Sequence, residues 1–176
     1  KGTLTDQGGE GTVIGRLEWL RRGDGAKVLA GMSASFNDGS AVLNPAIRAP
    51  LVLDKGVHQF QAGAHLTLAM GRLTYLAEVD HVRARSKADG GRGRALASYQ
   101  QLSLLARQGM ELQLFHEYLD PDLQLMNGYF QRIGASVEIY PWDYTELKVS
   151  GRRTFAPAGS PLAGLAEVFV MAHLFF

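Results

Sequence analysis

Several features that mark common classes of protein are absent from this sequence of 176 residues. It contains no cysteine, which excludes disulfide bonds, thiolate metal sites and a cysteine nucleophile. Its formal net charge is only +1, whereas a protein that binds nucleic acid electrostatically has a clear excess of lysine and arginine. No stretch approaches the roughly 20 consecutive apolar residues of a membrane-spanning helix. The hydrophobic content of 46% is nevertheless too high for a disordered chain.

What the sequence does contain is an alternation of apolar and polar residues with a period of two. Apolar residues occupy every second position in segments such as 28–36, 73–79 and 133–139, and this predicts β-strands with one apolar and one polar face. The segment from Ala95 to Arg107 is less clear, because its aromatic and aliphatic residues share a face with glutamine and arginine. A short helix is an alternative there. Counting this segment, we expect about nine strands of roughly ten residues.

Strand length, connection length and aromatic placement all favour a membrane-spanning β-barrel. A tilted strand needs about ten residues to cross a bilayer, whereas strands of soluble sandwiches typically have about five or six. Short and long connections alternate along the chain, as in outer-membrane barrels with tight periplasmic turns and extended extracellular loops. Most aromatic residues lie at strand ends, where the aromatic girdles of such barrels are found.

The segment from Val168 to Phe176 carries apolar side chains at every second position and ends on an aromatic residue. It resembles the C-terminal signature strand of bacterial outer-membrane β-barrel proteins. Residues 109–122 resemble a porin-type strand that enters an extracellular turn, and residues 140–142 resemble a periplasmic turn. The resemblance implies an all-β fold, an antiparallel transmembrane β-barrel of meander topology, in contact with lipid and lipopolysaccharide of the outer membrane. It also implies that the barrel-insertion machinery reads an assembly signal. The signal residues are Val168, Val170, Ala172, Leu174 and Phe176.

The strand count bears on how such a barrel closes. In lipid every backbone N–H and C=O group needs a partner, so a spanning sheet must be closed. If Phe176 is periplasmic, about nine strands place residues 1–10 outside the cell, whereas bacterial barrels have an even strand number and both ends in the periplasm. We therefore expect residues 1–176 to be a single β-barrel domain that lacks N-terminal strands, the C-terminal portion of a larger barrel. The alternative is a further strand in residues 3–5 or 41–53.

One face of the predicted strands is rich in charged residues. If valine, leucine and isoleucine face lipid, the opposite face lines a water-filled lumen whose charges set an ionic preference. Eight of these charged residues are acidic and five are basic, which predicts a mild preference for cations. The alternative is a set of ion pairs between strands that stiffens the wall and selects nothing. The predicted lumen-lining residues, one histidine included, are Arg16, Glu18, Lys27, His65, Glu78, Asp80, Glu111, Glu117, Arg132, Glu138, Glu146, Lys148, Arg152 and Glu167.

The sequence offers little for catalysis or metal binding, and we expect no enzyme, no metal and no cofactor. Ser136 and His173 share the polar face but lie on different strands, and no Gly-x-Ser-x-Gly motif is present. Residues 90–94 are rich in glycine but lack the lysine and serine or threonine of a phosphate-binding loop. We expect them to form a mobile extracellular loop whose arginines contact lipopolysaccharide phosphates. The histidines form no closely spaced ligand motif. They are His58, His65, His81, His116 and His173.

These observations predict an outer-membrane pore through which ions or small hydrophilic solutes diffuse passively. The segment 38–57 contains many apolar residues, and we expect it to fold inwards and constrict the channel; a pair of short strands is the alternative. A second function is a scaffold barrel whose lumen is plugged by a partner protein, and a second copy of the chain is a further candidate partner. A third is a soluble all-β binding module, in which residues such as Val149 pack in a core while Glu138 and Lys148 face solvent.

Overall fold

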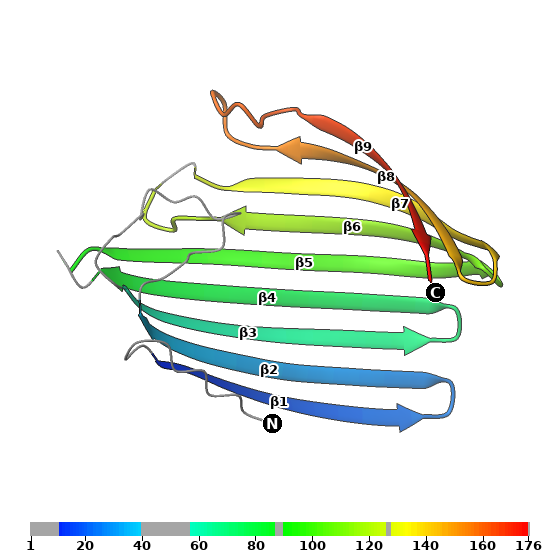
Figure 1. The fold of residues 1–176 in the computed structure, drawn as a ribbon, viewed down its shortest axis with the longest axis horizontal. Helices are drawn as coiled ribbons and strands as arrows, with labels where there is room; N and C mark the ends of the chain where they lie inside the picture. The colour runs from blue at the N-terminus through cyan, green and yellow to red at the C-terminus, as the bar shows by residue number, and fades with distance from the viewer. Residues whose placement is uncertain (1–10, 40–56, 87–89, 126–127, 176) are drawn as a thin grey trace.

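The computed structural model describes residues 11–39, 57–86, 90–125 and 128–175, which form one antiparallel sheet (Figure 1). Nine strands follow one another in the order of the sequence, and each pairs only with its neighbours in the chain. The predicted all-β meander of nine strands is therefore confirmed. The strands are β1 (Gly11–Gly23), β2 (Ala26–Gly39), β3 (Val57–Met70), β4 (Leu73–Ser86), β5 (Arg92–Arg107), β6 (Met110–Asp120), β7 (Phe130–Trp142), β8 (Thr145–Phe155) and β9 (Ala166–Leu174).

The weakly patterned segment 95–107 belongs to a strand, so the alternative of a short helix is wrong. β5 has 16 residues, more than any other described strand, and pairs with β4 on one side and β6 on the other. Leu102 lies opposite Leu114 on the apolar face. A register shift between Leu105 and Arg107 interrupts the alternation near the end of the strand. This irregularity affects only the end of the segment. Tyr99 and Gln101 pair in regular register and share a face, where the Tyr99 hydroxyl donates a hydrogen bond to Gln101.

Short turns lie at one end of the sheet and longer connections at the other (Figure 1). Two-residue turns join β1 to β2, β3 to β4, β5 to β6 and β7 to β8. Gly25 and Gly109 in these turns have φ values of 78° and 75°, a region that glycine adopts without steric cost. The predicted alternation of short and long connections is confirmed. One correction concerns residues 90–94, because β5 begins at Arg92 and the predicted loop is therefore partly strand. The longer connections are residues 40–56, 87–91, 121–129 and 156–165.

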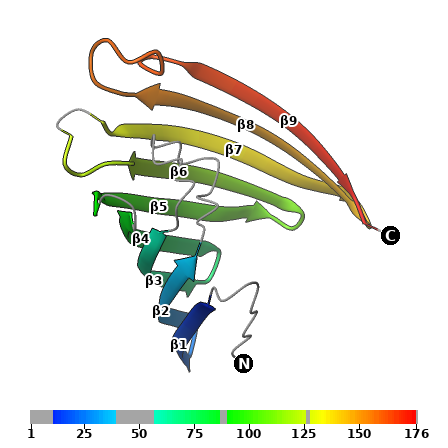
Figure 2. The ribbon, with the colours of Figure 1, turned by 60° about the vertical axis from the view of Figure 1, so that its left-hand side comes forward.

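The sheet is curved, but it does not close (Figure 2). β1 and β9 are its two edges and do not pair with each other. Closure into a barrel, which the sequence predicts, is therefore not seen in the part of the chain that the structure describes. Residues 3–5, residues 41–53 and Phe176 lie outside the described residues, as does most of the predicted constriction 38–57. No helix long and apolar enough to cross a membrane occurs among the described residues.

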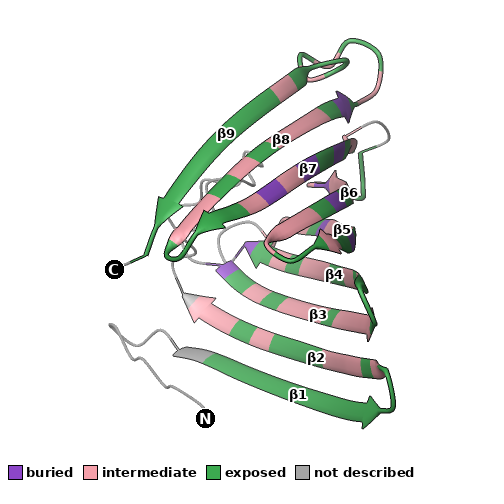
Figure 3. Ribbon diagram, turned by 90° about the vertical axis from the view of Figure 1, so that its right-hand side faces the viewer, coloured by how far each residue is buried: buried purple, intermediate pink, exposed green. Residues whose placement is uncertain are grey.

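The two faces of the sheet are buried to different extents, in the opposite sense to a water-soluble fold. Buried residues lie on strands between the two edges, whereas residues 13–23 of β1 and most of β9 are exposed (Figure 3). Polar side chains are buried in the middle strands, and Gln113, Ser136 and Glu138 are all 9% exposed or less. The apolar face is open, so that Leu114 is 61% exposed and Val170 is 76% exposed. Polar groups therefore line the less exposed face of the sheet. The buried hydrophobic residues in the described part of the chain are Val57 and Ala95.

This arrangement is the reverse of the one that we set out for a soluble binding module. Leu147 and Val149 are 39% and 50% exposed on the apolar face. The charged residues between and beside them are more occluded, since the side chains of Glu138 and Lys148 are 11% and 25% exposed. The charged groups thus occupy the sheltered side of β7 and β8, and the aliphatic groups occupy the open side.

Candidate functional site: the polar face of the sheet

Strand register places all fourteen predicted lumen-lining residues on one face of the sheet, called here the polar face. Residues directly opposite each other on neighbouring strands form rows that cross the whole sheet. That the polar face lines a lumen stays a prediction. One such row runs from β1 to β8 through Glu18, Gly31, His65, Glu78, Tyr99, Glu117, Arg132 and Thr154.

Three glycines on the polar face make room for a side chain from the neighbouring strand. A Cβ atom on any of these glycines would overlap the side chain directly opposite it. The space at Gly31 lets His65 reach across β2 towards Glu18 on β1, and 3.5 Å separates His65 Nε2 from Glu18 Oε1. Small residues therefore set which charged groups meet across strands. The three pairs are His65 over Gly31, Asp80 over Gly63, and Phe115 over Gly134.

Substituting Gly134 by alanine should destabilise the sheet. The new Cβ would overlap the ring of Phe115 and lie 2.6 Å from the carbonyl oxygen of Gly151, which is paired backbone on β8. Overpacking of this kind typically costs about 1–3 kcal/mol. Gly15→Ala is the matched control, because nothing lies within 4 Å of the new methyl group. Urea unfolding of both variants, refolded in detergent, measures the difference; equal stabilities would contradict the packing described for Gly134.

A buried hydrogen-bond network, called here the Gln113 network, occupies the middle of the polar face. Gln113 Nε2 donates to Glu111 Oε1 at 2.9 Å and to Glu138 Oε2 at 3.3 Å. Gln113 Oε1 accepts from Ser136 Oγ at 2.8 Å and from Lys148 Nζ at 3.1 Å. Lys148 Nζ also lies 3.3 Å from Glu138 Oε2. The amide of Gln113 is thereby fully hydrogen-bonded, which is what a polar group in an occluded position requires.

A second cluster lies beside the Gln113 network and is held by ion pairs between strands. Arg152 binds Glu167 in a bidentate pair, with Nε 2.8 Å from Oε2 and Nη2 3.3 Å from Oε1. Glu117 lies 3.5 Å from Arg132 and 3.9 Å from Arg152. The guanidinium of Arg152 also lies over the ring of Phe169, 4.8 Å from its centroid. On β6 to β9, therefore, most of the predicted lumen charges neutralise one another, as the ion-pair alternative proposes.

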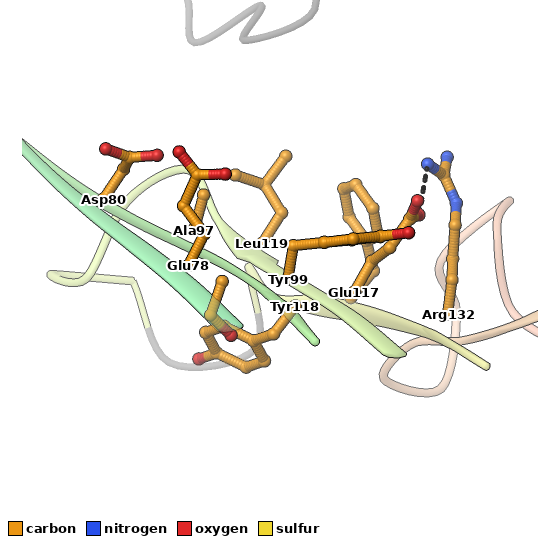
Figure 4. Close-up of a pocket in the computed structure, with 10 residues that line it drawn as sticks. Glu78, Asp80, Ala97, Tyr99, Glu117, Tyr118, Leu119 and Arg132 are labelled. Atoms are coloured by element: carbon orange, nitrogen blue, oxygen red, sulfur yellow. Dashed lines mark hydrogen bonds and ion pairs between the residues drawn. The ribbon is translucent and has the colours of Figure 1, made fainter. Parts of the chain in front are cut away.

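Glu78 and Asp80 on β4 differ from these residues. Neither has an ion-pair or hydrogen-bond partner within the described ranges. They line a depression of about 260 Å³ on the sheet together with Tyr99, Glu117 and Arg132 (Figure 4). The close-up shows the two carboxylates on the same side of the strands as the Glu117–Arg132 pair. The polar face thus carries uncompensated negative charge next to a neutralised cluster.

Ser136, His173 and Lys27 are the remaining polar-face residues considered in the sequence. Ser136 is hydrogen-bonded to Gln113, whereas His173 lies 3.1 Å from Glu146 at the end of β9, so the two are not brought together. Lys27 is exposed at the short-turn end of β2, opposite Arg22. Among the residues that the structure describes, no three histidine or carboxylate groups are placed to hold a metal ion.

The predicted assembly signal lies on the edge strand β9. Val168, Val170 and Leu174 are on the apolar face and are 75%, 76% and 64% exposed. Ala172 shares this face and lies opposite Leu147 on β8. These residues therefore form an exposed apolar row along an unpaired edge, and recognition of that row by the insertion machinery stays a prediction.

Sequence analysis did not identify the rings that pack between the charges of the polar face. Phe115 lies over Gly134 and Phe169 lies under the guanidinium of Arg152. The sequence did contain a sign of this placement, since Phe115 alternates with leucines and therefore shares a face with Gln113.

Comparison of the chain with protein-family models, with curated proteins and with solved structures gives no match.

Proposed function

We propose that the nine strands form part of an outer-membrane β-barrel pore for ions or small hydrophilic solutes. The observation that carries this proposal is the inverted burial, with a hydrogen-bonded polar face on the occluded side and an open apolar face. Water-soluble proteins rarely leave large contiguous apolar surfaces exposed. In a membrane barrel, the apolar face contacts lipid and the polar face surrounds a hydrated interior.

Closure of this barrel needs strands other than the nine described. The backbone groups at the outer edges of β1 and β9 have no partner strand in the sheet. In hydrocarbon each unpaired backbone group costs several kcal/mol, so both edges must be covered. Strands of 9 to 16 residues are long enough to cross a bilayer when tilted. We therefore propose a larger closed barrel in which further strands pair with β1 and β9.

The charges of the polar face support a preference for cations. The cations of the polar face on β7 and β8, which are Arg132, Lys148 and Arg152, are paired with carboxylates, so they contribute little net positive field. Glu78 and Asp80 have no such partners among the described residues and lie beside the same depression. Unpaired charges in a pore wall attract counter-ions and thereby set ionic selectivity.

Planar lipid bilayers that contain the purified protein should show discrete conductance steps with K⁺ more permeant than Cl⁻. The variant Glu78→Gln/Asp80→Asn should lower the permeability ratio about two- to fivefold, since a screened charge contributes up to about 1 kcal/mol. The control Asp24→Asn/Asp143→Asn removes the same charge from exposed short turns and should leave the ratio unchanged. Protein that inserts into the bilayer but shows no conductance would contradict the pore and favour the plugged scaffold barrel. Protein that stays monomeric and folded without detergent would contradict both.

A further inference from the structure

Four arginines gather on the apolar face, at the end of the sheet that carries the longer connections. Arg83 lies directly opposite Arg94, and Arg85 lies directly opposite Arg92, across β4 and β5. All four residues are exposed, and no carboxylate lies within ion-pair distance of them in the described ranges. Like charges directly opposite each other destabilise a sheet. These four residues, called here the arginine patch, therefore lack a counter-charge in the described structure.

The rows of the arginine patch continue onto aromatic residues of β3 and β2. Phe60 lies opposite Arg83, and Phe36 lies opposite Phe60, with exposures of 42% and 45%. Two acids lie near the patch in register, and both are already engaged. Asp120 on β6, opposite Leu96, accepts hydrogen bonds from the Tyr118 hydroxyl and the Asp122 amide, and Asp38 on β2 lies 3.1 Å from His58. The two phenyl rings and the arginine patch line one groove of about 280 Å³. This groove is cationic on one side and apolar on the other.

We propose that the arginine patch binds the phosphate groups of a lipid headgroup, of the kind that lipopolysaccharide carries, while the two phenyl rings contact its acyl region. A guanidinium group matches phosphate oxygens in bidentate geometry, and all four arginines line this groove. Aromatic rings are favoured at the membrane interface, and Phe36 and Phe60 lie in the same row of the sheet as Arg83 and Arg94. The orientation rests on the proposed function, because longer connections are extracellular in outer-membrane barrels and the patch would then meet the outer leaflet.

The test is a binding titration of the detergent-purified protein, read by native mass spectrometry. The probes are diphosphorylated lipid A, the same lipid with both phosphates removed, and inorganic phosphate alone. The test variant replaces the four arginines of the patch with glutamine. A paired variant, Arg83→Gln/Arg94→Gln, provides the same test if the quadruple variant does not fold. The control variant makes the same change at the other end of the sheet. Its substitutions are Arg21→Gln, Arg22→Gln, Arg72→Gln and Arg107→Gln, all at exposed positions.

The wild type should bind the diphosphorylated lipid at least about tenfold more tightly than the dephosphorylated lipid. Each arginine near an anionic lipid surface contributes about fivefold, so the paired variant should lose more than about tenfold and the quadruple variant more than about a hundredfold. The control variant should stay within about twofold of the wild type. Equal binding of the two lipids, or an equal loss in the control variant, would overturn the proposal. Displacement of the lipid by equimolar inorganic phosphate would overturn the assignment to a lipid.

This outcome is separable from that of the proposed pore. Binding of the phosphorylated lipid in detergent, with loss in the patch variant, supports the site even if the protein never conducts. Conductance in bilayers together with unchanged lipid binding by the patch variant would leave the pore standing and remove the site.

Discussion

Replacing Met32 by arginine should lower the free energy of unfolding from phospholipid vesicles by about 2–4 kcal/mol. Met32 lies at the middle of β2, on the apolar face, and is 60% exposed. It is flanked in register by Leu17 on β1 and Ala64 on β3. In a membrane barrel this position faces the bilayer midplane, where a charged side chain is most costly. Urea titration of the folded protein in vesicles, followed by tryptophan fluorescence, measures the loss.

Ser33→Arg is the matched control, because Ser33 is the next residue and is also exposed but faces the polar side. It lies between Arg16 on β1 and Gly63 on β3, and an arginine there remains hydrated. We expect a cost below about 1 kcal/mol. In a water-soluble fold both substitutions are exposed surface changes and each should fall within about 0.5 kcal/mol. Similar small costs at the two positions would contradict the proposed lipid contact of the apolar face.

The strands and their facing were predictable from the sequence because a period of two is a local property. Side chains alternate between faces at every residue, so an apolar residue at position 28 and another at 30 are on the same side whatever the strand pairs with. The same argument placed thirteen charged residues and His65 on one face, as the register confirms. It failed at the end of β5, where a register shift between Leu105 and Arg107 breaks the period.

Contacts between strands were not predictable, because they depend on register and on the space that neighbours leave. No spacing in the sequence indicates that Asp80 lies over Gly63 or that His65 reaches Glu18. Whether a charge is neutralised also depends on a pair of residues. Glu117 lies within ion-pair distance of Arg132, whereas Glu78 has no such partner among the described residues. A count of acidic and basic residues therefore predicts the sign of a preference but not the residues that produce it. Closure of the sheet into a barrel depends on which strands pair with its two edges, and the alternation of apolar and polar residues carries no information about that pairing.

Lys148→Gln should be strongly destabilising, with a cost of about 2–3 kcal/mol. It removes the cation that lies 3.3 Å from the carboxylate of Glu138, whose side chain is only 11% exposed. Breaking a fully buried pair typically costs about 3–5 kcal/mol, and the partial exposure of Lys148 lowers that figure here. Arg16→Gln is the control, because Arg16 and Glu18 are 62% and 43% exposed. Its cost should stay below about 1 kcal/mol.

The double variant Glu138→Gln/Lys148→Gln decides whether the cost comes from a stranded charge or from lost packing. Removing both charges leaves two amides, and the hydroxyl of Tyr140 and the amide of Gln113 remain as hydrogen-bond donors to residue 138. If the stranded carboxylate causes the loss, the double variant should be more stable than Lys148→Gln alone, with a coupling energy of about 1–3 kcal/mol. Urea unfolding of the four proteins in the cycle measures it. Strict additivity would show that the charges of Glu138 and Lys148 are not coupled, and the cost of Lys148→Gln would then come from lost packing and neutral hydrogen bonds.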